Sequence, residues 1–321
     1  MKFTLTDLGT FGGTWSAANA INSNGQVVGT FGSASDQFCF SWQQGSKTLT
    51  FADETSPRFC DARAVDFDGT IAGGMKTPNT FSRVGAFRRD PNGQITIVSH
   101  QRNADSWGLG VAKGTVVGLS ANQAVKWDSA GIATTLVNAP YGYAQANGIN
   151  SMGQIVGFTQ QGSGSFLSWV WQNGSLTNLP EFVPTWGTNA WAINDHGVVV
   201  GGGTQTYAGG ICVAIWYGGA PTNLGCGPWG LAISSDNWVV GGGRIWNWCT
   251  SGCARLSVPD FSCSLTDLNT LLDSSGAGWV VMTATGINDK HQIVGWGKSP
   301  RDGQNHAILL TPNNLPLCYP T

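Results

Sequence analysis

The sequence predicts an all-β fold: a seven-bladed β-propeller of four-stranded antiparallel blades, forming a single domain over residues 1–321. The first observation is composition. Glycine contributes 46 of 321 residues and charged residues only 11%, so turn formers outweigh helix formers. The second observation is a short motif that recurs along the chain. The third is an N-terminal segment that matches a strand missing from the last repeat.

The repeat has the form small-x-small-[Ile/Val]-[Asn/Asp]-x-x-Gly-x-[Val/Ile]-[Val/Ile]-Gly, as in residues 18–29. A period of about 40–45 residues, built from short strands and glycine turns, is typical of propeller blades. Seven segments fit the template, and their closing glycines lie 39 to 54 residues apart: Gly29, Gly73, Gly118, Gly157, Gly201, Gly241 and Gly295.

In the first unit the pattern predicts four strands, over residues 16–22, 26–31, 38–42 and 47–51. The first two are joined by Ser-Asn-Gly, and Asn and Gly tolerate the positive φ angles of a tight hairpin turn. Later units repeat this order. An insertion at residues 249–263 explains the long interval before the last repeat.

The last unit has three strands but no fourth. Residues 3–8, FTLTDL, match the fourth strand SLTDL at residues 264–268. We therefore expect the N-terminal strand to complete the final blade, which closes the ring and removes an exposed sheet edge.

Alanine or glycine fills two alternate positions of every predicted inner strand, for example Ala18 and Ala20. Alternation places such residues on one face of the strand. We expect this face to lie where neighbouring blades crowd together near the axis.

The composition also excludes several function classes. The net charge is −2 and there is no basic run, which argues against a nucleic-acid ligand. No apolar run approaches the roughly 20 residues of a membrane helix. The N-terminal residues lack an apolar signal core, so the chain is either cytoplasmic or has lost a signal peptide. We expect a monomer with no cofactor and no metal site.

Two segments carry a family resemblance. Residues 7–29, DLGTFGGTWSAANAINSNGQVVG, and the C-terminal stretch DLNTLLDSSGAGWVVMTATGINDKHQIVG resemble the HAF-type extracellular repeat of bacteria. The His-Ala-Phe itself survives only as His306, Ala307 and Ile308. The resemblance implies secretion and a propeller-like fold, and it implies no particular activity.

The eight cysteines contain no CxxC pair, so a disulfide framework in an oxidising compartment is favoured over a zinc cluster. Cys39 and Cys60 are expected to meet at the loop face, and Cys212 and Cys226 occupy near-matching positions in the fifth unit. Cys263 and Cys318 both lie on the turn face, and Cys249 and Cys253 share a short loop. The predicted pairs are Cys39–Cys60, Cys212–Cys226, Cys249–Cys253 and Cys263–Cys318.

Function is expected on the loop face, where the connections vary most. Turn aspartates on the other face, such as Asp66, Asp195 and Asp289, and the histidines His196 and His291 are interpreted as structural. Aromatic and amide side chains gather at the loop-face mouth of the central funnel and suit a sugar. The candidate ligand-binding residues are Trp15, Asn19, Trp107, Gln145, Asn147, Asn189, Trp191 and Trp229; packing between blades is the alternative for each tryptophan.

The catalytic candidates are Asp61, Arg63, His100 and Tyr143. A lyase needs a base and a cation that stabilises an enolate-like state, whereas a glycosidase needs paired carboxylates. Further carboxylates on this face are Asp36, Asp53, Glu54, Asp105, Glu181 and Asp302. Asp61 and Arg63 could equally form a plain salt bridge.

The leading hypothesis is a secreted module that binds a carbohydrate or similar polyhydroxylated ligand at one asymmetric site. The residues at this mouth differ from blade to blade, which favours one central site over seven copies. The first alternative is an enzyme using that funnel: a polysaccharide lyase, a glycoside hydrolase, or a small-molecule isomerase or cyclase. The second alternative is a protein-interaction scaffold.

Overall fold

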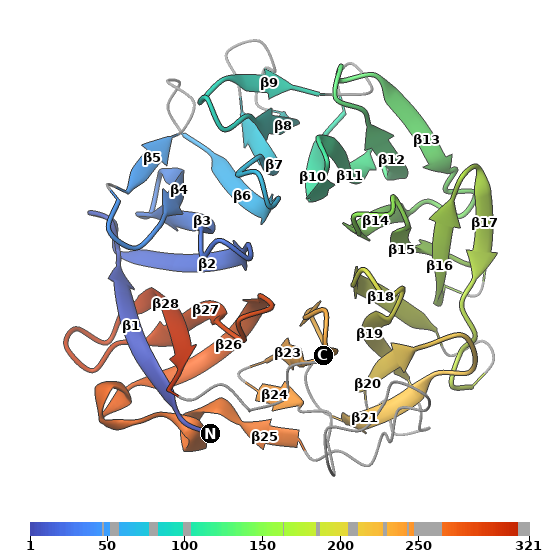
Figure 1. The fold of residues 1–321 in the computed structure, drawn as a ribbon. Coiled ribbons are helices and arrows are strands. Elements are labelled where there is room, and N and C mark those ends of the chain that lie inside the picture. The colour runs from blue at the N-terminus through green and yellow to red at the C-terminus, as the bar shows by residue number, and fades with distance from the viewer. Residues whose placement is uncertain are drawn as a thin grey trace.

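The computed structural model describes residues 1–46, 48–51, 58–76, 83–98, 104–162, 164–183, 187–204, 211–226, 230–242, 244–246 and 265–313. These residues form an all-β propeller of four-stranded antiparallel blades arranged around a central axis (Figure 1). The predicted fold class is confirmed at this level.

Strand pairing groups the described strands into seven four-stranded sheets. The first three in chain order start at the second strand: β2 (Trp15–Ile21), β3 (Val27–Gly32), β4 (Gln37–Trp42) and β5 (Leu49–Phe51); β6 (Cys60–Val65), β7 (Ile71–Lys76), β8 (Val84–Arg89) and β9 (Ile95–Ile97); and β10 (Ser106–Ala112), β11 (Thr115–Ser120), β12 (Gln123–Trp127) and β13 (Ala133–Val137).

The next three sheets follow the same order: β14 (Ala144–Ile149), β15 (Ile155–Gln160), β16 (Phe166–Gln172) and β17 (Ser175–Asn178); β18 (Thr188–Ile193), β19 (Val199–Thr204), β20 (Ile211–Trp216) and β21 (Thr222–Cys226); and β22 (Ala232–Ile233), β23 (Val239–Gly241), β24 (Arg244–Trp246) and β25 (Leu265–Asp267). In each sheet the first strand lies nearest the axis, and the innermost strands of successive sheets contact one another around the ring (Figure 1).

The last sheet joins the two ends of the chain. It contains β26 (Val280–Ile287), β27 (Ile293–Lys298), β28 (Asn305–Pro312) and, at its outer edge, β1 (Phe3–Gly9). Two 3-10 helices, η2 (Leu268–Leu271) and η3 (Ser274–Gly276), precede β26. Phe3 is fully buried and pairs with Pro312, so the predicted closure by the N-terminal strand is confirmed.

A β-bulge interrupts the inner strand of six sheets, which corrects the expectation of strict alternation. In β6, Ala62 pairs with Gly73 and Ala64 with Ala72, so Arg63 has no partner in the register. The other bulges lie at the same place in the repeat, at Asn19, Leu109, Asn147, Trp191 and Thr285. A bulge re-aims a side chain, and the residues at these positions differ between blades.

The Asn of the repeat links neighbouring blades on the turn face. Its side-chain oxygen accepts bonds from its own turn, as Asn194 does from His196 and Val198. Its amide donates to a carbonyl of the next blade: Asn22 to Asp66 (2.8 Å), Asn150 to Asn194 (3.0 Å), Asn194 to Ser234 (2.9 Å) and Asn288 to Asn22 (3.0 Å). The turn residues therefore secure the ring as well as each hairpin.

Turn aspartates add further links between blades. Asp66 accepts from the Lys113 amide, Asp195 from Ser151, and Asp289 from Ser235. These contacts give the aspartates structural partners in the adjacent blade, beyond the local turn bonds that their sequence context indicates.

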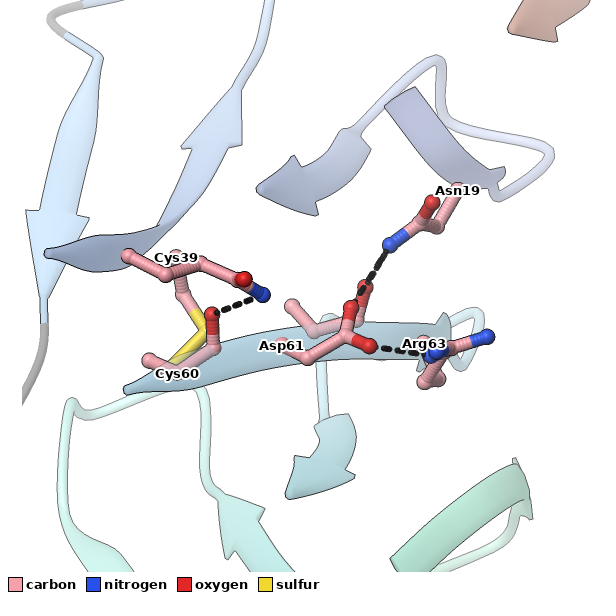
Figure 2. The surroundings of a disulfide bond; sticks show 7 residues. Asn19, Cys39, Cys60, Asp61 and Arg63 are labelled. Carbon is pink, nitrogen blue, oxygen red and sulfur yellow. Dashed lines mark hydrogen bonds and ion pairs between the residues drawn. A yellow bond between two sulfur atoms is a disulfide. The ribbon is translucent and has the colours of Figure 1, made fainter. Parts of the chain in front are cut away.

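Two of the four predicted disulfides are present, Cys39–Cys60 and Cys212–Cys226. The first connects β4 with β6 and so joins two neighbouring blades (Figure 2). The second joins β20 with β21 within one blade. Cys249, Cys253, Cys263 and Cys318 lie outside the described residues.

Candidate functional site

Nine candidate residues lie on, or directly before, five successive inner strands, β2, β6, β10, β14 and β18, each in contact with the next. We call this set the inner-strand arc. Its members are Asn19, Asp61, Arg63, Trp107, Tyr143, Gln145, Asn147, Asn189 and Trp191. The sequence identified these positions individually. The structure places them on consecutive strands around one part of the ring.

An ion pair occupies β6. Arg63 Nε lies 2.5 Å from Asp61 Oδ2, and the Asn19 amide of the neighbouring blade donates to Asp61 Oδ1 at 3.0 Å (Figure 2). The Asp61 side chain is 8% exposed and that of Arg63 is 47% exposed. Burial raises the pKa of the Asp61 carboxyl, and the charge and hydrogen bonds of Arg63 and Asn19 oppose this rise.

Aromatic rings continue the surface beside this pair. The Arg63 guanidinium carbon lies 5.7 Å from the centre of the Trp107 ring. Phe59 meets Trp107 edge to face at 5.5 Å, and Lys76 Nζ lies 5.9 Å from the centre of the Phe59 ring. Two rings thus lie between two cations.

On β14 and at the residue directly before it, three polar side chains form a chain of hydrogen bonds. The Tyr143 hydroxyl donates to Gln145 Oε1, Gln145 Nε2 donates to Asn147 Oδ1 at 2.5 Å, and Asn147 Nδ2 donates to the Ala190 carbonyl at 2.7 Å. Burial raises the pKa of the Tyr143 hydroxyl. The phenol is therefore held in its neutral form at neutral pH.

An aromatic cluster adjoins this chain. Phe158 contacts both Tyr143 and Trp191, with ring centres 6.2 and 5.6 Å apart. The side-chain oxygen of Asn189, on the same strand as Trp191, is buried and accepts no hydrogen bond from any described residue. A buried polar atom without a hydrogen bond lowers the stability of the fold unless a ligand or water provides the missing bond.

Some predicted ligand-binding residues have structural roles. Asn19 donates to the Ala62 carbonyl of the next blade, and Asn147 does the same to Ala190. Thr285 repeats this contact at Ala18. Trp15 packs beside Gly32, away from the bulges. His100 and Trp229 lie outside the described residues.

The other loop-face carboxylates bind backbone amides. Asp36 accepts from Arg58, Asp105 from Val84, and Glu181 from Gly187, at 2.8–2.9 Å. Each of these bonds ties one segment to another. Neither Asp36 nor Asp105 is hydrogen-bonded to a second carboxylate in the described part of the chain. Asp53 and Glu54 lie outside it.

A further cluster surrounds His306, which is 9% exposed. Its Nδ1 lies 2.8 Å from Asp7 Oδ1, and its Nε2 lies 3.0 Å from Asp302 Oδ2. A backbone bond from Gln304 and the bond with His306 lower the pKa of Asp302. The sequence predicted that residues 3–8 close the ring, but it did not give the register that brings Asp7 beside His306.

Within the described ranges, no three His, Cys, Asp or Glu side chains are grouped so that they could hold a metal ion. Those ranges likewise contain no helix with the length and apolar character needed to cross a membrane.

Comparison with known proteins shows the fold alone. No family model matches the chain, and no curated protein matches it either. The resemblance to the HAF-type repeat is therefore corrected. The physical reason lies in the hairpin: its small residues, turn Asn, buried valines and closing Gly are each required by the inner position of a propeller blade.

Solved structures are similar in fold and distant in sequence. Virginiamycin B lyase from Staphylococcus aureus matches with 14% identity and a TM-score of 0.60, over 97% of this chain and 100% of that chain. A catalytically inactive variant of that lyase with quinupristin matches with 13% identity and a TM-score of 0.59, over the same shares. YCF48 bound to a D1 peptide matches with 11% identity and a TM-score of 0.52, over 97% and 96%.

Proposed function

We propose that this chain is a secreted β-propeller that binds a carbohydrate or similar polyhydroxylated ligand against the inner-strand arc. The observation that carries the proposal is the placement of aromatic rings beside amide and guanidinium groups on five consecutive inner strands. Sugars present C–H faces that stack on rings and hydroxyls that bond to amides. The two disulfides support an oxidising, extracellular location.

The asymmetry of the ring supports a single site. The bulge residues are Asn19, Arg63, Leu109, Asn147, Trp191 and Thr285. A ligand that contacted each blade in the same way would require the same residue at each bulge. Unlike residues suit one ligand that contacts several blades at once.

Binding is favoured over catalysis by the state of the candidate catalytic groups. A general base must accept a proton, but the Tyr143 hydroxyl donates its proton to Gln145 and has a raised pKa. Asp61 is paired with Arg63. The fold is shared by a lyase and by a peptide-bound protein, so it does not separate an enzyme from a binding module, and residue geometry is the better guide.

A glycan array followed by isothermal titration would test this function. We expect the wild-type chain to bind at least one oligosaccharide without releasing products, and Trp191→Ala to weaken binding about tenfold because buried aromatic contacts dominate such sites. The control is Trp171→Ala, which removes a half-buried tryptophan that packs against Lys126 outside the arc. Absence of binding to every glycan, with unchanged tryptophan fluorescence, would refute the proposal. Product release would favour the enzyme alternative.

A further inference from the structure

Among the bulge residues named above, Arg63 alone carries a charge. It is the bulged residue of β6, its side chain is about half exposed, and its Nε is engaged by Asp61. Its two terminal nitrogens form no hydrogen bond with another described residue. A guanidinium carries five N–H donors in a planar fork, so the end of the fork is available to a ligand.

Asp61 orients that fork. The carboxylate is buried, and its two oxygens are held by different blades: Oδ1 by Asn19 of β2 and Oδ2 by Arg63 of β6 (Figure 2). A side chain fixed in this way loses less conformational entropy when it binds a ligand than a free arginine would. Asp61 therefore fixes the position of the Arg63 guanidinium more firmly than an exposed surface salt bridge would.

The aromatic strip beside Arg63 ends in a second cation. Trp107 lies next to Arg63, Phe59 next to Trp107, and Lys76 next to Phe59, at 5.7, 5.5 and 5.9 Å. Asp61 offsets the charge of Arg63, whereas Lys76 forms no ion pair with any described carboxylate. The strip therefore carries two cations, and the nearby carboxylate of Asp105 is engaged by the amide of Val84, the register partner of Lys76, and not by Lys76 itself.

We infer that the ligand of this site is an acidic glycan, with one carboxylate bound end-on by Arg63 and its sugar rings lying along Trp107 and Phe59 toward Lys76. This inference rests on the proposed function and narrows it from polyhydroxylated ligands to uronic-acid oligosaccharides. A carboxylate matches the guanidinium fork with two parallel hydrogen bonds. The net charge of −2 and the absence of a basic run favour a sugar over a nucleic acid.

Isothermal titration with a trimer of galacturonic acid, a trimer of mannuronic acid and the methyl ester of each would test the inference. The esters keep the sugar and remove the charge. We expect at least one acid to bind about tenfold more tightly than its ester, because charge-assisted bidentate bonds are roughly twice as strong as neutral ones. This preference should decrease as salt increases.

Substitutions test whether the Arg63 guanidinium, and not the fold as a whole, provides the affinity for the acid. Arg63→Gln should lower affinity for the acid about tenfold and leave affinity for the ester unchanged, and Lys76→Gln should give a smaller loss. Arg301→Gln, an exposed arginine in the loop before β28, is the matched control and should change neither affinity. If Arg63→Gln unfolds because Asp61 is left buried and unpaired, the double variant Asp61→Asn/Arg63→Gln removes both charges and provides the same test.

The outcomes distinguish failure of the acidic-glycan inference from failure of the proposed function. Equal binding of acid and ester, or acid binding that survives loss of Arg63, would overturn the acidic-glycan inference while leaving the proposed function in place. Tighter binding of a thymidine oligonucleotide than of either acid would overturn it in favour of a nucleic acid. Failure of every sugar to bind would overturn the proposed function itself, and the inference with it.

Discussion

Gly73 lies directly against the backbone of Asp61: a Cβ atom built on Gly73 would lie 2.0 Å from the Asp61 carbonyl oxygen. The same contact recurs between other closing glycines and inner strands, at 2.1 Å from Gly29 to Ala17 and 1.7 Å from Gly118 to Trp107. The bulge turns this carbonyl toward the partner strand, and only glycine leaves room for it. The closing glycine of each repeat therefore makes room for the bulge, and the bulge carries a side chain that varies between blades.

Replacing Gly73 by alanine should consequently destabilise the second blade by about 1–3 kcal/mol or more, the usual cost of inserting atoms into packed structure. The phenyl ring of Phe87, 2.7 Å from the same built Cβ, closes the other side of the site. Urea unfolding followed by tryptophan fluorescence would measure the loss. Gly219→Ala is the control, because Gly219 has no atom within 4 Å of its built Cβ. Equal stability of the two variants would contradict the proposed role of the bulge.

The architecture was predictable from sequence because its signals are local and repeated. The Asn-Gly turns, the buried valine pairs and the match between residues 3–8 and 264–268 each report on one hairpin or one strand. The bulges were not predictable, since a two-residue alternation of alanines looks the same with or without an inserted residue. The contact of Asp61 with Asn19, or of Asp7 with His306, depends on how blades and chain ends meet, which no local pattern encodes.

The repeat asparagines that link neighbouring blades on the turn face predict that stability is especially sensitive to substitution of Asn194. Its amide donates to the Ser234 carbonyl and to Asn237 Oδ1, both in buried surroundings. Asn194→Asp keeps the acceptor for the turn and removes these donors, so it should cost about 1–3 kcal/mol by leaving buried acceptors unsatisfied. The matched control is Asn24→Asp, which loses a similar bond to the Phe67 carbonyl at an exposed site. Thermal unfolding that ranks the two variants equally would count against these asparagine contacts as a source of stability.

The contacts of His306 predict that this side chain helps to hold the closing strand β1 in place. It bridges Asp7 on the closing strand β1 and Asp302 in the loop before β28. A hydrogen bond to a charged group contributes about 1.5–3 kcal/mol to stability. His306→Ala should therefore lower the free energy of unfolding measurably and increase hydrogen exchange in β1. His196→Ala, at an exposed turn, is the control and should have little effect. Unchanged exchange in β1 would show that closure does not depend on this bridge.

The buried Asp61 predicts a pH dependence of definite sign. Burial raises its pKa above 3.8, against the opposing effects of Arg63 and Asn19. As pH rises the unfolded chain loses this proton first, so between the two pKa values the folded state binds more protons and the free energy of unfolding falls. Above the folded-state pKa the loss is complete. The stability of wild type relative to Asp61→Asn should therefore decrease from pH 3.8 through the folded-state pKa and then level off.

Asp273 provides a control of opposite sign for this measurement. Hydrogen bonds from Ser275, Thr4 and Asn313 hold the pKa of Asp273 well below its usual range. Its contribution to stability is present above pH 3.8 and is lost as pH falls through the folded-state pKa, so wild type should lose stability relative to Asp273→Asn on acidification. Urea midpoints for wild type and both variants between about pH 3 and pH 7 would cover the range in which free carboxyl groups titrate. The stability of wild type relative to Asp61→Asn could instead rise with pH, as is expected relative to Asp273→Asn. That result would mean that the effects of Arg63 and Asn19 on the pKa outweigh burial and that these partners hold Asp61 as a carboxylate.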